Sequence, residues 1–282
     1  MAAHAKAATG SIHVSSNSLL TTLKFSFPLR LMALPRTAES SLRKVFILGF
    51  GGGLVSADSV DLQVTVDASS SLLLLSQSAT KVFKSHGETT TLNSLTASVH
   101  TRATLLILPE PVILFRNASF TQIQNINLDP LANLVFLDWF TAGRVSRGEK
   151  WEFSKYSSTT TIRRGGVLIA RDATLLDHLS LDSAHPAPSL AVGPFTTFAT
   201  LIFVGPNIPL PPKFTSQINP YAKLPSRAAQ AQLLVSASPL PTCTDGLIIR
   251  IAGVLTDDVR AVIRSCLNPV QALLGNLDWS RI

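Results

Sequence analysis

The chain has 282 residues, enough to bury a full hydrophobic core as one large domain or two small ones. Hydrophobic residues make up 46% and charged residues 15%, with a formal net charge of +7. A proline and three threonines interrupt the most apolar stretch, residues 189–204, which falls short of the about 20 residues of a membrane span. No nucleic-acid-binding motif accompanies the basic charge, so neither a membrane nor a nucleic acid is an expected partner.

The N-terminal residues and the cysteines bear on where the protein works. Residues 1–10 are predicted to be disordered, and they lack the apolar region of a secretory signal. Two cysteines, Cys243 and Cys266, are typical of a reducing compartment and not of a disulfide framework. We therefore expect a cytoplasmic protein.

Most of the chain is predicted to form short β-strands with alternating apolar and polar residues. The expected strands are 11–23, 25–31, 45–48, 60–66, 71–76, 80–84, 92–99, 103–108, 112–115, 119–127, 133–140, 151–163, 167–176, 199–204, 231–237 and 247–251. Turns are expected at Gly87-Glu88, Gly148-Glu149 and Gly165-Gly166. Many short strands at close spacing favour an all-β stack, sandwich or solenoid.

The glycines after the strand 45–48 suggest a dinucleotide-binding loop at first sight. Such a loop has glycine at its first, third and sixth positions and leads into a helix. Counted from Gly49, the sixth position is Leu54, and residues 60–66 alternate as a half-buried strand does. The glycines therefore favour a tight turn or a close backbone approach, and a dinucleotide-binding oxidoreductase is the alternative interpretation.

The C-terminal third contains a proline-rich loop, residues 205–226, and a helical segment, residues 256–275. Thr256 is the predicted N-cap, followed by two acidic residues that suit the helix dipole. Pro269 should end the first helix at Asn268 and begin a second short helix that runs through Leu274. The residues of one apolar helix face are Val259, Val262, Ile263, Cys266 and Leu267. This face is expected to pack on the β stack, with recruitment of a partner helix as the alternative.

No catalytic motif emerges from the sequence. It has no phosphate-binding loop, no zinc-protease motif, no C-x-x-C and no G-x-S-x-G, so no enzymatic activity is expected. The six histidines do not have the spacing of a tight metal site. We therefore expect no tightly bound cofactor.

Several segments, in a fixed order, resemble the urease accessory protein UreD family, also called UreH. They are Pro28-Leu29-Arg30, Gly51-Gly52-Gly53-Leu54-Val55 with Asp58, the strand 60–66, the leucine run 72–75, residues 76–82, Leu108-Pro109-Glu110-Pro111 with 113–115, Asp138-Trp139, Gly143-Arg144 and Arg147-Gly148-Glu149. The resemblance covers the chain from about Gly10 to the C-terminus. Ser56-Ala57 departs from it, because a Gly-Gly pair is common there in the family.

The resemblance implies a fold and a function. The fold would be all-β: a β-helix-like stack of strands with two short C-terminal α-helices, in one domain spanning residues 1–282. The function would be that of a non-enzymatic urease maturation factor. It would bind apo-urease and a UreF-type partner and, through that partner, a UreG-type GTPase, and it would help deliver nickel to urease. A β-solenoid interaction module without a metal role is a further alternative.

A protein that passes Ni²⁺ onward should offer weak oxygen ligands, because a deep binding well would trap the ion. Carboxylates in apolar, strand-like surroundings are the candidates for this transient path, namely Asp58, Asp61, Glu110, Asp138 and Asp172. The alternative for Asp58 is a turn carboxylate, and for the others a solvated charge. Trp139 and Phe140 are expected in the core, where Asp138 would need water or a cation.

A second set of residues lies in the segments that carry the resemblance and is assigned to partner binding. These residues are Gly51, Gly52, Gly53, Thr80, Lys81, Arg144 and Glu149. Lys81 is expected either to pair with a carboxylate or to face solvent. The densest basic region, residues 144–171, is either a solvated strand face or a surface complementary to an acidic protein partner.

Overall fold

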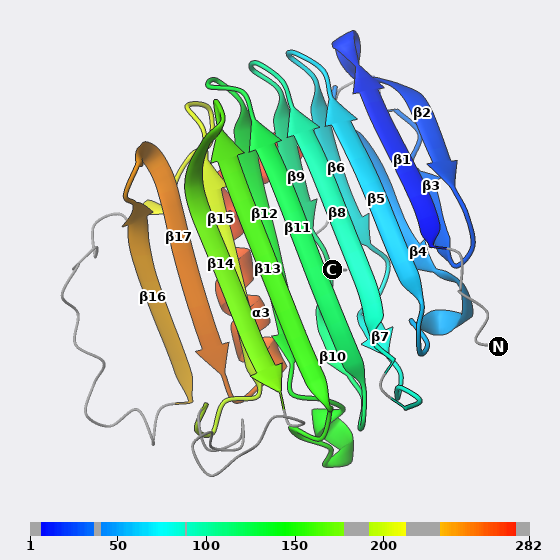
Figure 1. Ribbon diagram of the computed structural model, residues 1–282. Helices are drawn as coiled ribbons and strands as arrows, with labels where there is room; N and C mark the ends of the chain where they lie inside the picture. The colour runs from blue at the N-terminus through cyan, green and yellow to red at the C-terminus, as the bar shows by residue number, and fades with distance from the viewer. Residues whose placement is uncertain (1–6, 37–40, 88, 178–191, 213–231, 275–282) are drawn as a thin grey trace.

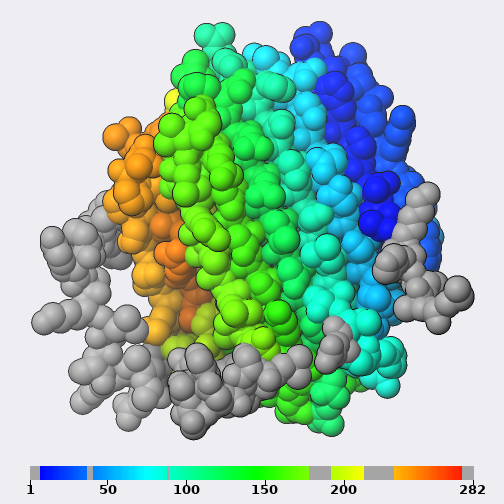
Figure 2. Space-filling model, in the orientation of Figure 1, coloured from blue at the N-terminus to red at the C-terminus, as the bar shows by residue number. Residues whose placement is uncertain are grey.

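The computed structural model describes residues 7–36, 41–87, 89–177, 192–212 and 232–274, which form two facing β-sheets (Figure 1). The first sheet, sheet A, has seven strands. In spatial order they are β14 (Val167–Asp177), β13 (Lys155–Arg164), β11 (Ser119–Leu128), β8 (Thr91–Val99), β5 (Ser59–Val66), β1 (Ala8–Ser15) and β2 (Leu19–Phe25). Figure 2 shows the outer face of this sheet as a continuous surface from β1 to β14.

The second sheet, sheet B, has ten strands. Its main path is β16 (Leu233–Leu240), β17 (Cys243–Gly253), β15 (Thr197–Val204), β12 (Asn133–Thr141), β9 (Thr104–Leu108), β6 (Ser71–Ser76), β4 (Arg43–Gly49) and β3 (Leu29–Ala33). Two short strands, β7 (Thr80–Val82) and β10 (Val112–Leu114), continue from the end of β12.

The chain alternates between the sheets and so winds a solenoid. Strands β5, β8, β11 and β13 are parallel neighbours in sheet A, and β4, β6, β9 and β12 are parallel neighbours in sheet B. At each end of the stack, antiparallel pairs replace the parallel ones. The β-helix-like fold expected from the sequence is confirmed.

Sheet B is covered on both faces, which explains its long apolar runs. Leu72 and Leu74 point into the core between the sheets, whereas Leu73 and Leu75 belong to a second core on the outer side. A helix, α3 (Thr256–Leu267), lies on that outer side, behind the sheet in Figure 1. A strand buried on both faces has no need of polar alternation.

The C-terminal helical segment matches the prediction except at its cap. After α3 come a 3₁₀ turn at Asn268–Val270 and α4 (Gln271–Leu274). The helix-preceding residue is Leu255, not Thr256, and it makes no side-chain capping bond. Thr256 is the first helical residue instead, and its hydroxyl lies 3.0 Å from that of Thr197. No helix in the described part of the chain is both long and apolar enough to span a membrane.

Several expected strand boundaries are wrong. The expected strand 25–31 is interrupted by a turn at residues 26–28, so that Phe25 ends β2 and Leu29 begins β3. Strand β1 begins at Ala8, inside the segment 1–10 expected to be disordered, of which residues 1–6 lie outside the described ranges. The expected strand 11–23 is two strands, because Asn17 and Ser18 have positive φ and reverse the chain. The expected strand 151–163 begins only at Lys155, because Trp151 has φ 59°. Residues 205–211 are irregular, as expected, and the remainder of the proline-rich segment from 213 onward lies outside the described residues.

Candidate functional site

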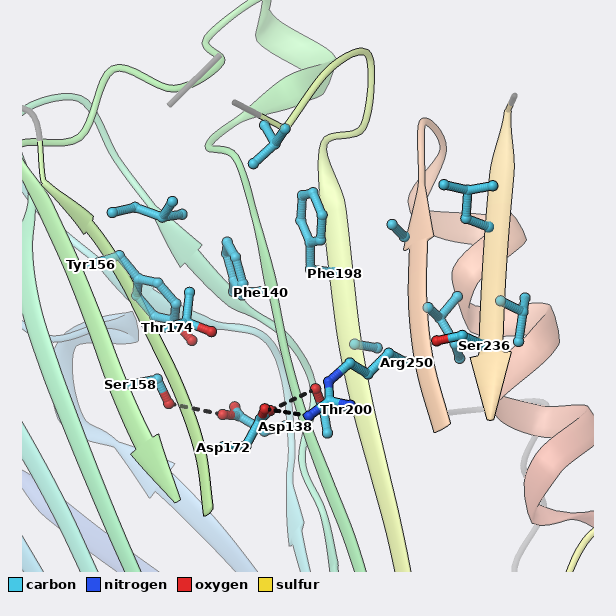
Figure 3. Close-up of a pocket in the computed structure, with 17 residues that line it drawn as sticks. Asp138, Phe140, Tyr156, Ser158, Asp172, Thr174, Phe198, Thr200, Ser236 and Arg250 are labelled. Atoms are coloured by element: carbon cyan, nitrogen blue, oxygen red, sulfur yellow. Dashed lines mark hydrogen bonds and ion pairs between the residues drawn. The ribbon is translucent and has the colours of Figure 1, made fainter. Parts of the chain in front are cut away.

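A cavity of about 520 Å³ lies between the two sheets, bounded by β14 on one side and by β15, β17 and β16 on the other (Figure 3). One part of its lining is polar and carries Asp138 and Asp172. The other part is aromatic, with Phe140, Tyr156 and Phe198 in a row. We call it the acidic cavity.

The two carboxylates enter the acidic cavity from opposite sheets. Asp138 lies on β12 of sheet B, paired with Thr200 of β15. Asp172 lies on β14 of sheet A, paired with Thr160 of β13. They are 34 positions apart in sequence, and only the winding of the chain brings them into one cavity.

Asp138 is held by neutral donors from sheet A. Its carboxylate accepts hydrogen bonds from the Ser158 hydroxyl at 2.9 Å and from the Gln122 side-chain amide at 3.1 Å. Burial between the sheets raises its pKa, and the negative charge of Asp172 adds to the rise, whereas these hydrogen bonds oppose it. The carboxylate is therefore more costly to ionise than an ordinary aspartate.

Asp172 has a cation beside it. One oxygen accepts a hydrogen bond from the Thr200 hydroxyl at 3.0 Å, and the other lies 2.9 Å from the Arg250 guanidinium. Arg250 is half exposed, so this pair is open to solvent on one side. The polar part of the acidic cavity thus contains two carboxylates and one guanidinium (Figure 3).

The aromatic part of the acidic cavity is closely packed and uncharged. The Phe140 ring lies 4.3 Å from the Tyr156 ring and 5.5 Å from the Phe198 ring, measured between centroids. Burial, together with the charge of Asp138, raises the pKa of Tyr156 well above its ordinary value. A neutral wall next to two acids disfavours anions and leaves a polar corner suited to a cation.

The acidic cavity offers oxygen ligands and no tight cage. Carboxylate and hydroxyl oxygens bind hard or hydrated divalent cations. Within the described residues, no group of three or more histidine, cysteine, aspartate or glutamate side chains is placed to hold a metal ion. A cation in this cavity would therefore keep part of its water shell.

The other three candidate carboxylates lie elsewhere. Asp58 accepts a hydrogen bond from the Val55 backbone N–H at 2.8 Å, as a turn carboxylate does. Asp61 points away from the buried face of β5 and binds Gln63 and Ser94. Glu110 forms two hydrogen bonds with the Arg260 guanidinium, at 2.8 and 2.7 Å. The structure therefore brings only Asp138 and Asp172 together.

The residues assigned to partner binding converge on a second site. A groove of about 650 Å³ lies along the short strands β7 and β10, and we call it the motif groove. Its lining combines segments far apart in sequence, namely Gly51, Gly52, Lys81, Phe83, Phe115, Arg144 and Arg147 among others. Gly53 and Thr80 line the adjoining pocket near β4, and Glu149 lies behind Arg144.

Two glycines of this region permit a close approach of backbones. A Cβ atom on Gly53 would lie 2.6 Å from the Lys81 carbonyl oxygen. Gly143 has φ 140°, and a Cβ there would lie 2.8 Å from the Glu149 carbonyl oxygen. Gly51 and Gly52, also at positive φ, form a 3₁₀ turn that leads toward a strand and not into an α-helix. The geometry of a dinucleotide loop is therefore not present at these glycines.

Glu149 is buried and fully neutralised. It accepts hydrogen bonds from the Arg144 side chain, at 3.1 Å to Nε, and from the Arg116 backbone N–H at 2.8 Å. The hydrogen bond with Arg144 is the main reason why the pKa of Glu149 is lowered. Arg144 in turn stacks on Phe115, with the guanidinium carbon 4.3 Å from the ring centroid. Lys81 is exposed, so the solvent-facing alternative holds for it.

Sequence reasoning missed four partners of the cavity carboxylates, namely Gln122, Ser158, Thr200 and Arg250. The pattern of β11 contained a signal for the first. Gln122 and Gln124 share the inward parity of Phe120 and Ile126, whereas Ile123 is 39% exposed. Polar residues at inward positions indicate a polar interior.

Comparisons with known proteins point in one direction. The family model described as UreD urease accessory protein matches residues 3–280. The urease accessory protein UreD of Sorangium cellulosum (strain So ce56) is 32% identical over 279 residues, covering 98% of this chain and 84% of that protein. Urease accessory protein D of Oryza sativa subsp. indica is 28% identical, covering 97% of this chain and 95% of that protein. Urease accessory protein 4 of Cryptococcus neoformans var. grubii is 27% identical, covering 98% and 94%.

Proposed function

The chain belongs to the urease accessory protein UreD family, and we propose that its part in urease maturation is that of a non-enzymatic scaffold and nickel passage. Nickel is the cargo here and not a resident cofactor. In this proposal the cytoplasmic protein binds apo-urease and a UreF-type partner, which in turn links it to a UreG-type GTPase. GTP hydrolysis belongs to that partner.

The observation that carries the passage is the acidic cavity. Asp138 has hydrogen bonds only from neutral groups and a second carboxylate near it, so its charge lacks full compensation. A divalent cation that entered would supply this compensation while keeping some of its water. Two carboxylates bind such an ion weakly enough to release it, which is what a carrier requires.

Asp58, Asp61 and Glu110 have a smaller part in this proposal. Each already has protein hydrogen-bond donors, and Glu110 has a full guanidinium partner. Asp138 and Asp172 have such donors too, so the difference is one of place: of the five candidate carboxylates, only these two line the acidic cavity. We assign Asp58, Asp61 and Glu110 to outer positions that an ion passes on its way to or from the cavity.

Two alternatives from the sequence are less well supported. A dinucleotide-binding oxidoreductase requires a helix directly after the glycines, but the chain has a short turn and then β5 there. A β-solenoid without a metal role assigns no function to the two carboxylates, Asp138 and Asp172, that line one cavity.

Removal of the gene tests the proposal. In nickel-supplemented cells, we expect urease from a strain without this gene to contain little nickel and to regain it when the intact gene is returned. Co-purification of the chain with urease subunits should accompany the rescue. Normal nickel content in the deletion strain would contradict a role in maturation, and tight binding of NAD or GTP by the purified chain would contradict the non-enzymatic assignment.

A further inference from the structure

The motif groove lies along the two short strands β7 and β10, which continue sheet B from the end of β12. Here β10 pairs in parallel with β7 and with the end of β12, so that Ile113 lies between Lys81 and Thr141. A neighbouring hollow of about 740 Å³ shares Phe83, Phe115 and Arg144 with the groove. The two hollows therefore form one continuous surface of the molecule.

This surface is strongly basic. Its lining includes six lysine or arginine side chains and one carboxylate, Glu110; the cations are Lys81, Lys84, Arg116, Arg144, Arg147 and Arg260. Three of the cations form ion pairs with the protein's own carboxylates. The pairs are Arg260–Glu110, Arg144–Glu149 and Arg116–Glu152. A positive excess therefore remains on the surface.

That excess comes from Lys81, Lys84 and Arg147. All three side chains are exposed, and the described residues provide none of them with a carboxylate partner. They enter the surface from two separate segments of the sequence, one at β7 and one at the turn after β12. Clustered charges of one sign attract an oppositely charged partner and speed its association.

The aromatic residues between these cations favour a peptide over a nucleic acid. Phe83 and Phe115 pack edge to face, with centroids 5.1 Å apart and planes at 90°. The Arg144 guanidinium already covers the Phe115 ring. A nucleobase needs a free aromatic face for stacking, whereas apolar side chains of a peptide can pack against ring edges.

The chain itself has no acidic segment to offer this surface. Outside the described ranges, 37–40, 178–191 and 275–282 contain one acidic residue each, position 88 is a single glutamate, 1–6 contain none, and 213–231 contain none and three basic residues. An occupant that matches the charge must therefore come from another protein.

We propose that the motif groove, with the hollow beside it, binds an acidic peptide segment with interspersed apolar side chains, contributed by another protein of the urease maturation assembly. This inference rests on the proposed function, which supplies the assembly. The carboxylates of the segment pair with Lys81, Lys84 and Arg147, and its apolar side chains contact Phe83 and Phe115.

Charge reversal tests the proposal. The test variant combines Lys81→Glu, Lys84→Glu and Arg147→Glu, three exposed positions at which folding should be retained. The matched control combines Lys24→Glu, Arg163→Glu and Arg171→Glu, which change the net charge equally at exposed positions of sheet A away from the groove. Purified apo-urease, the UreF-type protein and the UreG-type protein from the same organism serve as separate probes in a binding assay at low and at high salt.

We expect the test variant to bind one of these probes at least about tenfold more weakly than the control variant does, with the larger loss at low salt. Reversing the acidic residues of that partner's segment to lysine should restore binding to the test variant. If the intact chain binds a probe and both variants bind it equally well, the groove proposal is wrong and the proposed function stands.

Two other outcomes are decisive as well. If the intact chain binds none of the three probes, the proposed function fails together with the groove proposal. If the test variant loses binding to RNA or DNA oligonucleotides while its binding to all three proteins is unchanged, the groove is a nucleic-acid site and the proposal is overturned.

Discussion

Asp138 is a partly buried carboxylic acid and Glu149 a buried one, and their pKa values are shifted in opposite directions. Burial raises the pKa of Asp138, and the Arg144 guanidinium lowers that of Glu149. Asp138 accepts hydrogen bonds from an amide and a hydroxyl, whereas Glu149 accepts them from a guanidinium and a backbone N–H. The comparison shows that burial alone does not decide the role of a carboxylate.

The difference separates a carboxylate whose charge the protein itself compensates from one whose charge can attract a cation. Glu149 is compensated by the protein itself and holds Arg144 and the backbone at Arg116 in place. Asp138 is compensated only in part and has another acid near it. A cation would therefore lower the free energy of the folded protein at Asp138 and would find little to gain at Glu149.

The largest effect should follow from the removal of Glu149. The variant Glu149→Ala leaves the Arg144 guanidinium and the Arg116 N–H without their acceptor, and we expect a loss of about 3 kcal/mol in the free energy of unfolding. The matched control is Glu152→Ala, which breaks a more exposed ion pair with Arg116 and should cost less than about 1 kcal/mol. Equal losses in urea unfolding would refute the structural role of Glu149.

The next effect is a change in the pH dependence of stability. Folding raises the pKa of Asp138. Its contribution to the free energy of unfolding is therefore fully present below the pKa of the unfolded chain and is lost as the pH rises through the pKa of the folded chain. The variant Asp138→Asn remains neutral and should be more stable than the intact chain by about 1 kcal/mol at neutral pH, measured without metal. This difference in stability between Asp138→Asn and the intact chain should disappear at acidic pH, where Asp138 is protonated in both states.

Glu149 should behave in the opposite way. Its pKa is lowered by folding, so its contribution is present above the unfolded pKa and is lost as the pH falls through the folded pKa. The stability difference between the intact chain and Glu149→Gln should therefore shrink in acid. If Asp138→Asn and Glu149→Gln changed the pH profile in the same direction, the contrast between the two carboxylates would be wrong.

The smallest effect concerns Asp58, a candidate for the nickel path that the structure places in a turn. Asp58→Ala removes the acceptor of the Val55 N–H and should cost about 1 kcal/mol, whereas Asp58→Asn keeps an acceptor and should cost much less. Neither variant should lower the nickel content of the urease produced, beyond any loss in protein yield. A large loss of nickel from the urease matured with a well-expressed Asp58→Asn variant would indicate that the nickel path includes this turn.

Local patterns predicted much of the fold and little of the acidic cavity. The alternation in 60–66 and the apolar stripe of the C-terminal helix depend on neighbours in sequence, and both predictions agree with the structure. The pairing of Asp138 with Ser158 and the nearness of Asp172 depend on which coils of the solenoid lie side by side, which a single sequence does not reveal. Glycine spacing argued against a dinucleotide loop without excluding it, and only the backbone shows how closely Gly53 approaches the Lys81 carbonyl oxygen.

The central claim is that nickel passage depends on Asp138 and Asp172 and little on the outer carboxylates. The most direct measurement is the nickel content per urease active site in complexes matured with Asp138→Ala/Asp172→Ala, compared with the outer double variant Asp58→Asn/Asp61→Asn. Pull-down yield of the assembled complex is recorded for both. We predict that the cavity variant assembles but leaves urease largely without nickel, and that the outer variant loads it fully. Full nickel loading by a cavity variant that assembles normally would contradict the passage and leave this protein only a scaffold role.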